Sequence, residues 1–156
     1  MITIRKYKNG DAKAMSRLIS NTYARFCASE GTPDAVRRYV ESYDPRGKTL
    51  ADIRKRFAKT PLCFVAVNGS RIVGVVRGVE NRLVNLFVDA RFHRRGVATR
   101  LIKRFEKICQ KTDITDIVLR ASLYAVPFYQ SMGYTKITGV RNFHGLKVQP
   151  MKKRLK

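Results

Sequence analysis

Apolar residues recur along the first two thirds of the chain with two different spacings. Apolar or alternating runs predict strands over residues 2–6, 62–67, 72–79 and 83–88. Recurrence at every third or fourth position predicts a helix that Asp11 caps and that ends near Cys27, polar helices over 34–42 and 50–59, and a helix over 97–110. Asn68-Gly69 between two apolar runs is a strong hairpin signal. Antiparallel hairpins bracketed by helices favour a mixed α/β sheet.

The last third of the chain continues the same mixture in shorter pieces. We expect a short buried strand over 117–119, a short helix over 124–132 closed by Gly133, a strand over 134–138, a loop over 139–145 and an alternating strand over 146–151. Pro150 has no N–H to donate to a neighbouring strand. Its presence predicts a sheet edge or a bulge at that point.

Composition fits one globular domain spanning residues 1–156. Hydrophobic residues make up 44% of the chain, and no apolar run reaches the ~18 residues of a membrane span. The start of the chain lacks the apolar stretch of a secretory signal, so we expect a cytoplasmic protein. Cys27, Cys63 and Cys109 form no Cys-x-x-Cys pair, which favours reduced, buried thiols over a metal site or a disulfide.

Charge is the strongest anomaly of the composition. The chain has 33 Lys and Arg against 11 Asp and Glu, a net charge of +22, which implies attraction to polyanions such as nucleic acid or a phosphorylated cofactor. Residues 91–104 hold six basic residues and no acid. Residues 30–52 hold five acids against four basic residues, so a basic substrate could approach there.

The segment that joins the strand over 83–88 to the helix over 97–110 carries the clearest chemistry. Gly96 stands where the helix begins, and the first N–H groups of a helix have no partner inside it. The helix dipole is positive at that end, so main chain alone can bind an anion there. Arg94 and Arg95 flank the opening and can add charge-assisted contacts to phosphate oxygens. The segment therefore predicts a site for a pyrophosphate.

Three segments together resemble the GNAT superfamily of acyl-CoA-dependent N-acetyltransferases. Residues 86–88, Leu-Phe-Val, followed by 93–98, His-Arg-Arg-Gly-Val-Ala, are similar to the strand and the Gln/Arg-x-x-Gly-x-Gly/Ala loop of that family. Residues 121–134 resemble the family's Ala-x-x-Phe-Tyr-x-x-x-Gly-Phe/Tyr element. Residues 125–134, Ala-Val-Pro-Phe-Tyr-Gln-Ser-Met-Gly-Tyr, match it at every fixed position. Residues 149–153 resemble a closing strand. His93 departs from the pattern, since it occupies the usual Gln/Arg position.

The resemblance implies a GNAT-like fold, a mixed and mostly antiparallel twisted sheet flanked by helices, and acetyl-CoA as the acyl donor, with no metal. It also implies direct attack of an amine on the thioester. The residues implied to bind acetyl-CoA are Leu86, Phe87, Val88, His93, Arg94, Arg95, Gly96, Val97, Ala98, Thr99 and Ser122. A backbone N–H near Val88 would polarise the thioester oxygen. Helix capping is the alternative role for Ser122.

Catalysis requires two proton transfers, and the resemblance assigns only one of them. Tyr129 matches the general acid that protonates the departing thiolate, and a buried structural ring is its alternative role. The base that deprotonates the amine stays open, because Asn85 stands where relatives often have an acid. The candidates are Glu80, Glu30, Glu41 and ordered water, with His144, in the loop before the last strand, as a further candidate.

The acceptor is an amine of a small molecule or of a protein. Residues 28–59 and 139–145 are expected to shape its pocket, in a protein that is a monomer or a homodimer and does not enter a membrane. The charge of +22 supports a rival function, a basic nucleic-acid- or ribosome-associated module with the same fold and little or no catalysis.

Overall fold

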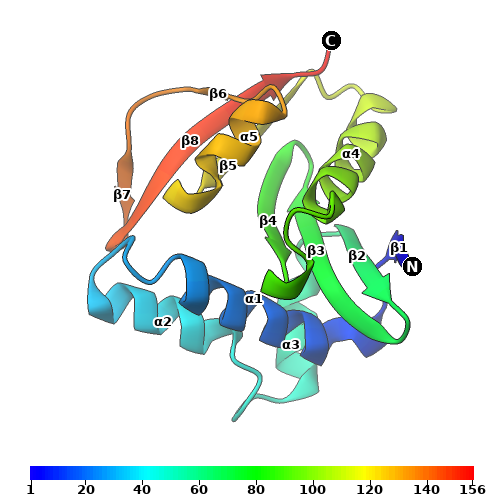
Figure 1. Ribbon diagram of the computed structural model, residues 1–156, viewed down its shortest axis with the longest axis vertical. Coiled ribbons are helices and arrows are strands. Elements are labelled where there is room, and N and C mark those ends of the chain that lie inside the picture. The colour runs from blue at the N-terminus through cyan, green and yellow to red at the C-terminus, as the bar shows by residue number, and fades with distance from the viewer.

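A computed structural model describes residues 1–156 as a twisted sheet with helices on both faces (Figure 1). The strands follow the order β1-β2-β3-β4-β5-β8-β6, and β7 pairs with β8. All neighbouring strands are antiparallel except β4 and β5, which are parallel. The architecture is therefore the mixed, mostly antiparallel α/β sheet that the sequence predicts. The strands are β1 (Ile2–Lys6), β2 (Leu62–Asn68), β3 (Arg71–Val79), β4 (Arg82–Val88), β5 (Asp116–Ala121), β6 (Thr135–Lys136), β7 (Arg141–Phe143) and β8 (Leu146–Arg154).

The helices fall close to their predicted positions. Thr32 and Thr49 accept hydrogen bonds at the starts of the second and third helices, and both helices carry an acid in the first turn. The α-helices are α1 (Ala12–Phe26), α2 (Pro33–Tyr43), α3 (Leu50–Ala58), α4 (Val97–Gln110) and α5 (Val126–Ser131). Three short 3-10 helices join them: η1 (Asn9–Asp11), η2 (Ala90–Phe92) and η3 (Leu123–Ala125).

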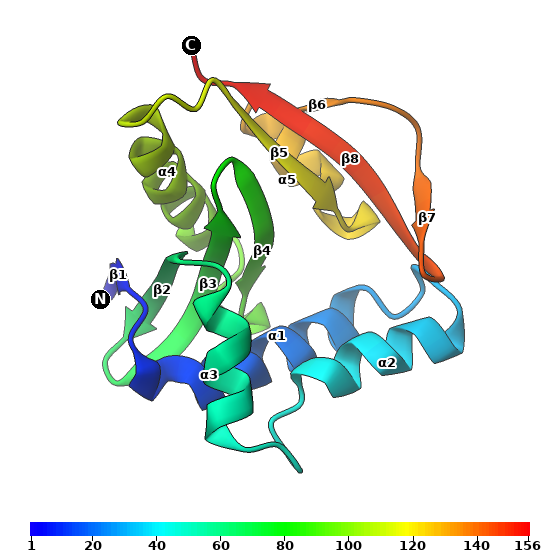
Figure 2. The ribbon, with the colours of Figure 1, turned by 180° about the vertical axis from the view of Figure 1, so that it is seen from behind.

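Alternating side chains of the strands divide the interior into two cores. Phe64 and Ala66 of β2 pack with α4 in the larger core, whereas Cys63 and Val65 pack with α1 and α3 in the second. Figure 2 shows α3 in front of β3, on the face of the sheet opposite α4. All three cysteines are free and buried.

The centre of the sheet is bent where β3 meets β4. The register shifts between Arg77 and Gly78, which leaves Val84 as an extra residue in β4. A Cβ on Gly78 would lie 2.6 Å from the ring of Phe105 and 2.3 Å from the carbonyl oxygen of Arg82, so no larger residue fits there.

The pairing between β4 and β5 is short. Only two residue pairs, Arg82 with Val118 and Leu83 with Leu119, connect these strands. Beyond them the strands separate, so residues 86–88 of β4 have no partner on the β5 side. This wedge between two strands provides room for a ligand inside an otherwise continuous sheet.

Two details at the end of the chain differ from the sequence prediction. The strand expected over 134–138 is only the short β6, and the predicted loop over 139–145 contains β7. Pro150 lies in β8, which is paired with β5 along its length rather than at a sheet edge, so the prediction of an edge was wrong. The carbonyl oxygen of Pro150 accepts from the N–H of Ile137, so its nitrogen also faces the β6 side. Because this nitrogen faces away from β5, the missing N–H costs no bond to β5, and Pro150 lies beyond the two residue pairs that join β6 to β8.

None of the helices combines the length and the apolar character that a membrane span requires.

Candidate active site

The turn before α4 presents a row of unused backbone donors. None of the six N–H groups from Arg94 to Thr99 has an acceptor within the protein, and the first bond of α4 runs from the Arg100 N–H to the Gly96 carbonyl. Arg94 and Gly96 have positive φ angles of 61° and 74°, which turn successive N–H groups toward one side. A Cβ on Gly96 would meet no protein atom within 4 Å, so the space above these donors is open. This cradle, the set of free N–H groups of residues 94–99, fits a pyrophosphate.

His93 is used by the protein itself. Its Nε2 lies 2.7 Å from the carbonyl oxygen of Val88, and its ring stacks on Phe26 with centroids 4.8 Å apart. The ring therefore fastens the loop to the end of β4. The His93 side chain is therefore engaged within the protein and leaves the main-chain N–H groups of residues 94–99 as the open donors.

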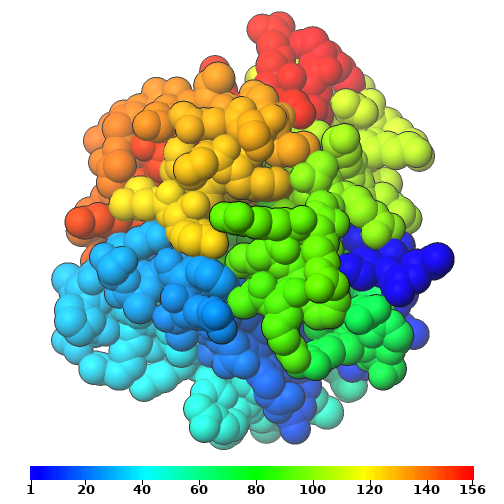
Figure 3. All heavy atoms as spheres, in the orientation of Figure 1, coloured from blue at the N-terminus to red at the C-terminus, as the bar shows by residue number.

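A cleft of about 340 Å³ runs from this cradle into the wedge between β4 and β5. Figure 3 shows this face, where the residues after β5 and the η2–α4 segment stand on either side of a hollow above α1. Nearly all residues predicted to bind the cofactor line the cleft, namely Leu86, Phe87, Val88, His93, Arg94, Gly96, Val97, Ala98, Thr99 and Ser122, together with Tyr129. Arg95 does not line it, because its guanidinium lies over the ring of Phe92, 5.2 Å from the centroid.

One wall of the cleft, formed by the end of α1, was not predicted from the sequence. Thr22, Phe26 and Cys27 of α1 and its C-terminal end line the cleft opposite α5. Phe26 stacks between His93 and Tyr124, with both centroid distances 4.8 Å. The half-buried Phe26 at the end of an amphipathic helix was the available signal, but only the tertiary structure brings it against a turn some 65 residues away.

Tyr129 occupies the narrow part of the wedge. Only 4% of the residue is exposed, and burial raises the pKa of its hydroxyl above the usual value. The hydroxyl forms no hydrogen bond within the protein, whereas the neighbouring Tyr134 hydroxyl donates to Glu106 at 2.8 Å. A protonated phenol with a free O–H is suited to donate a proton to a leaving group.

A second cavity of about 230 Å³ lies on the other side of the same wedge. It shares Leu86, Phe87, Ser122, Ala125 and Tyr129 with the first cleft, so Tyr129 is a wall of both. The remaining lining comes from segments far apart in the sequence: Tyr23, Tyr39, Tyr43, Val84, Asn85, Arg120, Ala121, Phe143, Leu146, Lys147 and Val148. Residues 28–59 and 139–145 contribute to it, as predicted for an acceptor pocket.

The floor of this second cavity is a buried polar network. Arg77, 4% exposed, donates to Asn85 Oδ1 at 2.5 Å, to the Tyr43 hydroxyl at 2.6 Å and to Thr60 Oγ1 at 3.0 Å. Asn85 Nδ2 in turn donates to the Tyr39 hydroxyl at 3.2 Å. All partners of the guanidinium are neutral, so this buried charge has no carboxylate counter-ion.

The carboxylates considered as general base do not line either cavity. Glu41 is exposed on α2 beside Arg37, with its carboxylate oxygen 4.0 Å from Nε. Glu80 is in the turn between β3 and β4, at the end of β4 opposite the cradle. His144 lies outside both cavities, at a positive φ of 53° in the β7–β8 turn.

Glu30 has a structural role. Its two carboxylate oxygens accept from the N–H groups of Leu123 and Tyr124 at 2.6 and 3.0 Å, and its own carbonyl accepts from Lys147 at 2.7 Å. Ser122 stands at the N-cap of η3, but its side chain makes no capping bond because Glu30 supplies the acceptors. Glu30 thus joins the α1–α2 loop to the segment that leads to Tyr129.

Cys27 is the only thiol in the cleft. Burial, reinforced by the nearby charge of Glu30, raises its pKa to about 12. At neutral pH the group is a thiol, which is a poor nucleophile.

Comparison with known proteins agrees with this geometry. The family described as "Acetyltransferase (GNAT) domain" matches residues 27–155. The N-acetyltransferase YafP of Escherichia coli (strain K12), named as uncharacterized, is 25% identical over 136 residues, covering 87% of this chain and 83% of YafP. A GCN5-related N-acetyltransferase from Rhodopseudomonas palustris superposes with a TM-score of 0.82 at 19% identity, over 98% of this chain and 95% of that one. The PaiA N-acetyltransferase from Thermoplasma acidophilum, solved in complex with coenzyme A, superposes with a TM-score of 0.75 at 20% identity, over 99% of both chains. The family match spans most of the chain, and the chain belongs to the GNAT acetyltransferases.

Proposed function

We propose that residues 1–156 act as one catalytic unit that transfers the acetyl group of acetyl-CoA directly to a primary amine. The observation that carries the proposal is that two cavities at the wedge between β4 and β5 share part of their lining, with Tyr129 in the wall of both. The acyl donor occupies the larger cleft and the amine occupies the smaller cavity.

Most of the groups that bind the acyl donor belong to the backbone. The free N–H groups of residues 94–99 bind the pyrophosphate, and the guanidinium of Arg94 adds a charge-assisted contact. The unpaired edge of residues 86–88 lies along the cleft and binds the pantetheine arm by main-chain hydrogen bonds. Acetyl-CoA supplies an activated acyl group, and the N–H of Val88 stabilises the negative charge that develops on its carbonyl oxygen.

The acceptor amine loses its proton to water in our proposal. An ordinary alkyl amine has a pKa of about 10.4 and is an ammonium at neutral pH, so the proton must leave before attack. No carboxylate lines the acceptor cavity, and water is the remaining candidate among those that the sequence left open. Tyr129 donates its proton to the sulfur of the departing coenzyme A as the C–S bond breaks. The nitrogen of the collapsing intermediate gives up its remaining excess proton, through water, to restore the Tyr129 hydroxyl, and the amide is released.

Transfer without an acyl-enzyme is favoured by the state of Cys27. A pKa of about 12 leaves almost no thiolate at neutral pH, and no other cysteine lines the cleft. The amine therefore attacks the thioester itself.

The experiment that tests the proposal has two stages. Calorimetry on the folded protein is expected to show acetyl-CoA binding at one site per chain, weakened by Arg94→Gln. A thiol assay with a mixed panel of primary amines is expected to show amine-dependent release of coenzyme A. Folded protein that binds no acetyl-CoA would refute the proposal.

The charge of +22 favours a second candidate, a nucleic-acid- or ribosome-associated role with the same fold. A structural neighbour with a TM-score of 0.66 at 15% identity is named a ribosomal-protein-S18-alanine N-acetyltransferase of Escherichia coli, over 99% of this chain and 94% of that one. Binding to RNA that falls steeply with salt, without amine-dependent release of coenzyme A, would favour this role over catalysis. A cytoplasmic location is part of both proposals, and the monomer and the homodimer stay open.

A further inference from the structure

The acceptor cavity is positively charged at its opening. Arg120 at the end of β5 and Lys147 at the start of β8 line it, and both side chains are exposed. Neither side chain forms an ion pair or a hydrogen bond within the protein. The ion pairs of the molecule involve other residues, namely Arg5–Asp11, Arg37 with Asp34 and Glu41, Arg46–Asp44, Arg91–Asp89 and Lys153–Glu106.

The acidic residues of segment 30–52, which the sequence predicts near the acceptor, make their contacts outside the acceptor cavity. Glu30 is committed to the N–H groups of η3, and Asp34 and Glu41 pair with Arg37 on the exposed side of α2. Asp44 is bound to Arg46 at 2.6 Å, and Asp52 is exposed in the first turn of α3, outside the cavity. The excess of acid over base in residues 30–52 therefore creates no negative pocket, and a basic acceptor finds no partner there.

Arg77 adds a third positive charge behind the floor. It contacts Asn85 and Tyr43, both of which line the cavity, and lacks a carboxylate partner. A buried charge without a counter-ion disfavours a second cation nearby and favours an anion.

We propose that the acceptor is a small primary amine that also carries an anionic group, a carboxylate or a phosphate, which Arg120 and Lys147 bind at the mouth of the cavity. The inference rests on the proposed acetyl transfer and names the substrate class of that site. The guanidinium of Arg120 lies over the ring of Phe143, 4.2 Å from the centroid, so its planar fork is oriented before the acceptor arrives. A volume of about 230 Å³ suits a molecule of a few carbon atoms between the amine and the anion.

Amines matched in length and differing only at the far end test this inference. The panel is 4-aminobutanoate, 3-aminopropyl phosphate, butylamine and 1,4-diaminobutane, each offered to the acetyl-CoA-loaded protein. We expect kcat/KM for at least one anionic amine to exceed that for butylamine by roughly tenfold or more, and the diamine to be the poorest substrate. The ratio between the carboxylate and the phosphate compounds identifies the anionic group.

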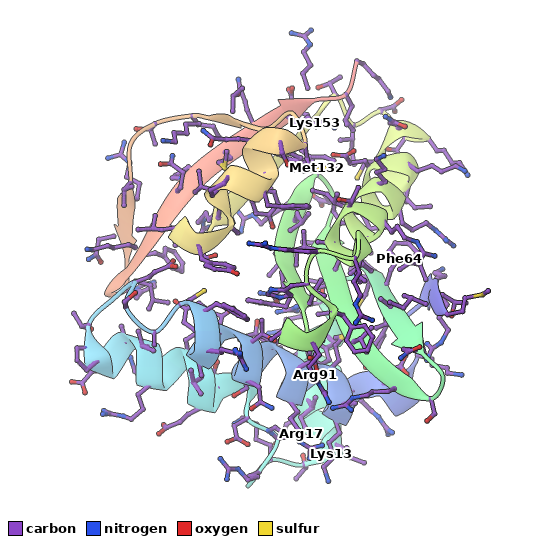
Figure 4. All side chains as sticks on the ribbon, in the orientation of Figure 1. Lys13, Arg17, Phe64, Arg91, Met132 and Lys153 are labelled. Atoms are coloured by element: carbon purple, nitrogen blue, oxygen red, sulfur yellow. The ribbon has the colours of Figure 1, made fainter.

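Two variants and one control locate the effect. Arg120→Gln and Lys147→Gln are each expected to lower kcat/KM for the anionic amine by about five- to tenfold, a larger drop than for butylamine, which carries no anionic group. Lys13→Gln removes the same charge from the exposed side of α1 at the lower edge of Figure 4, outside both cavities, and is expected to change neither value. Arg120, Lys147 and Lys13 are all exposed, so thermal melting is expected to show that all three variants are folded.

The possible outcomes distinguish failure of this inference from failure of the proposed acetyl transfer. Butylamine or the diamine used as well as the anionic amines would overturn the inference and leave acetyl transfer intact. The inference would also be overturned if acetyl-CoA bound but no anionic amine were acetylated or bound. Absence of acetyl-CoA binding would instead refute the proposed function.

Discussion

The two cavities that meet at Tyr129 are built in different ways. The donor cleft is made largely by one continuous stretch, residues 86–99, and its polar groups are mostly backbone N–H groups. The acceptor cavity is made by side chains from α1, α2, β4, β5 and the β7–β8 hairpin. A site formed by main chain depends on local conformation, whereas a site formed by side chains depends on which segments the fold brings together. Substitutions of side chains can therefore change the ligand of the acceptor cavity without altering the donor cleft.

Tyr129, the wall that both cavities share, offers the sharpest test of this difference. Tyr129→Phe is expected to lower kcat by about 100-fold or more while leaving the affinity for acetyl-CoA nearly unchanged, because only the proton donor is removed. The ring contacts with Phe128 and Tyr134, both at 5.5 Å, are retained. Steady-state release of coenzyme A and calorimetry measure the two quantities.

Tyr134→Phe is the matched control for that substitution. It removes a buried hydroxyl that donates to Glu106 outside both cavities, so it is expected to lower stability and to spare kcat. Equal kcat values for Tyr129→Phe and the unmodified protein would remove Tyr129 from the acid role.

The main-chain character of the donor cleft is tested by adding one methyl group. Gly96→Ala is expected to weaken acetyl-CoA binding by roughly tenfold, because the new Cβ enters the open space over the phosphate donors and strains a φ of 74°. Gly47→Ala is a close control, since Gly47 has a φ of 76° and equally open surroundings in a loop outside the cleft.

Both glycine variants are expected to lose about 1 kcal/mol of unfolding free energy from backbone strain. Only Gly96→Ala is expected to change the dissociation constant in calorimetry. Equal affinities for the two variants would show that the cradle does not hold the donor.

The connection between the α1–α2 loop and the segment that leads to Tyr129 is tested at Glu30. Glu30→Gln is expected to lower the unfolding free energy by about 1–2 kcal/mol, because the charge-assisted bonds to the N–H groups of Leu123 and Tyr124 are weakened or lost. A smaller loss of kcat/KM, about threefold to fivefold, is expected because η3 leads directly into the helix that carries Tyr129. Chemical denaturation and kinetics measure the two effects.

Glu41→Gln controls for the loss of charge. Glu41 is exposed and its contact to Arg37 is 4.0 Å long, so the expected change is within about 0.5 kcal/mol. If the two variants lost the same stability, Glu30 would not be the connection between the loop and η3.

The smallest effect is expected at Cys27. Cys27→Ala is expected to keep kcat/KM within about threefold, since a thiol with a pKa of about 12 carries no acyl group at neutral pH. Mass spectrometry of the unmodified protein after exposure to acetyl-CoA without amine is expected to show no acetyl adduct at this residue. An adduct that an amine then removes would replace direct attack with a two-step transfer.

Local patterns predicted much of the fold and the donor cleft. The hairpin at Asn68-Gly69, the strand before the cradle and the helix from Val97 to Gln110 were identified because their signals lie within a few neighbouring residues. The length of β6, the presence of β7 and the position of Pro150 inside the sheet were not, since they depend on which strand lies alongside β8. Roles assigned to individual site residues, including Tyr129, stay predictions until the variants are measured.

Local signals in the amino-acid sequence were enough to identify the family and the row of free N–H groups at the start of α4, because such donors follow from backbone conformation. The contacts of the acids and the charge around the second cavity could be read only from the folded chain. Glu30 accepts from the N–H groups of η3, and Arg77 is a buried cation without a carboxylate counter-ion. The electrostatic effect of a charged side chain depends on its distance from other charges and from water, and folding sets both distances.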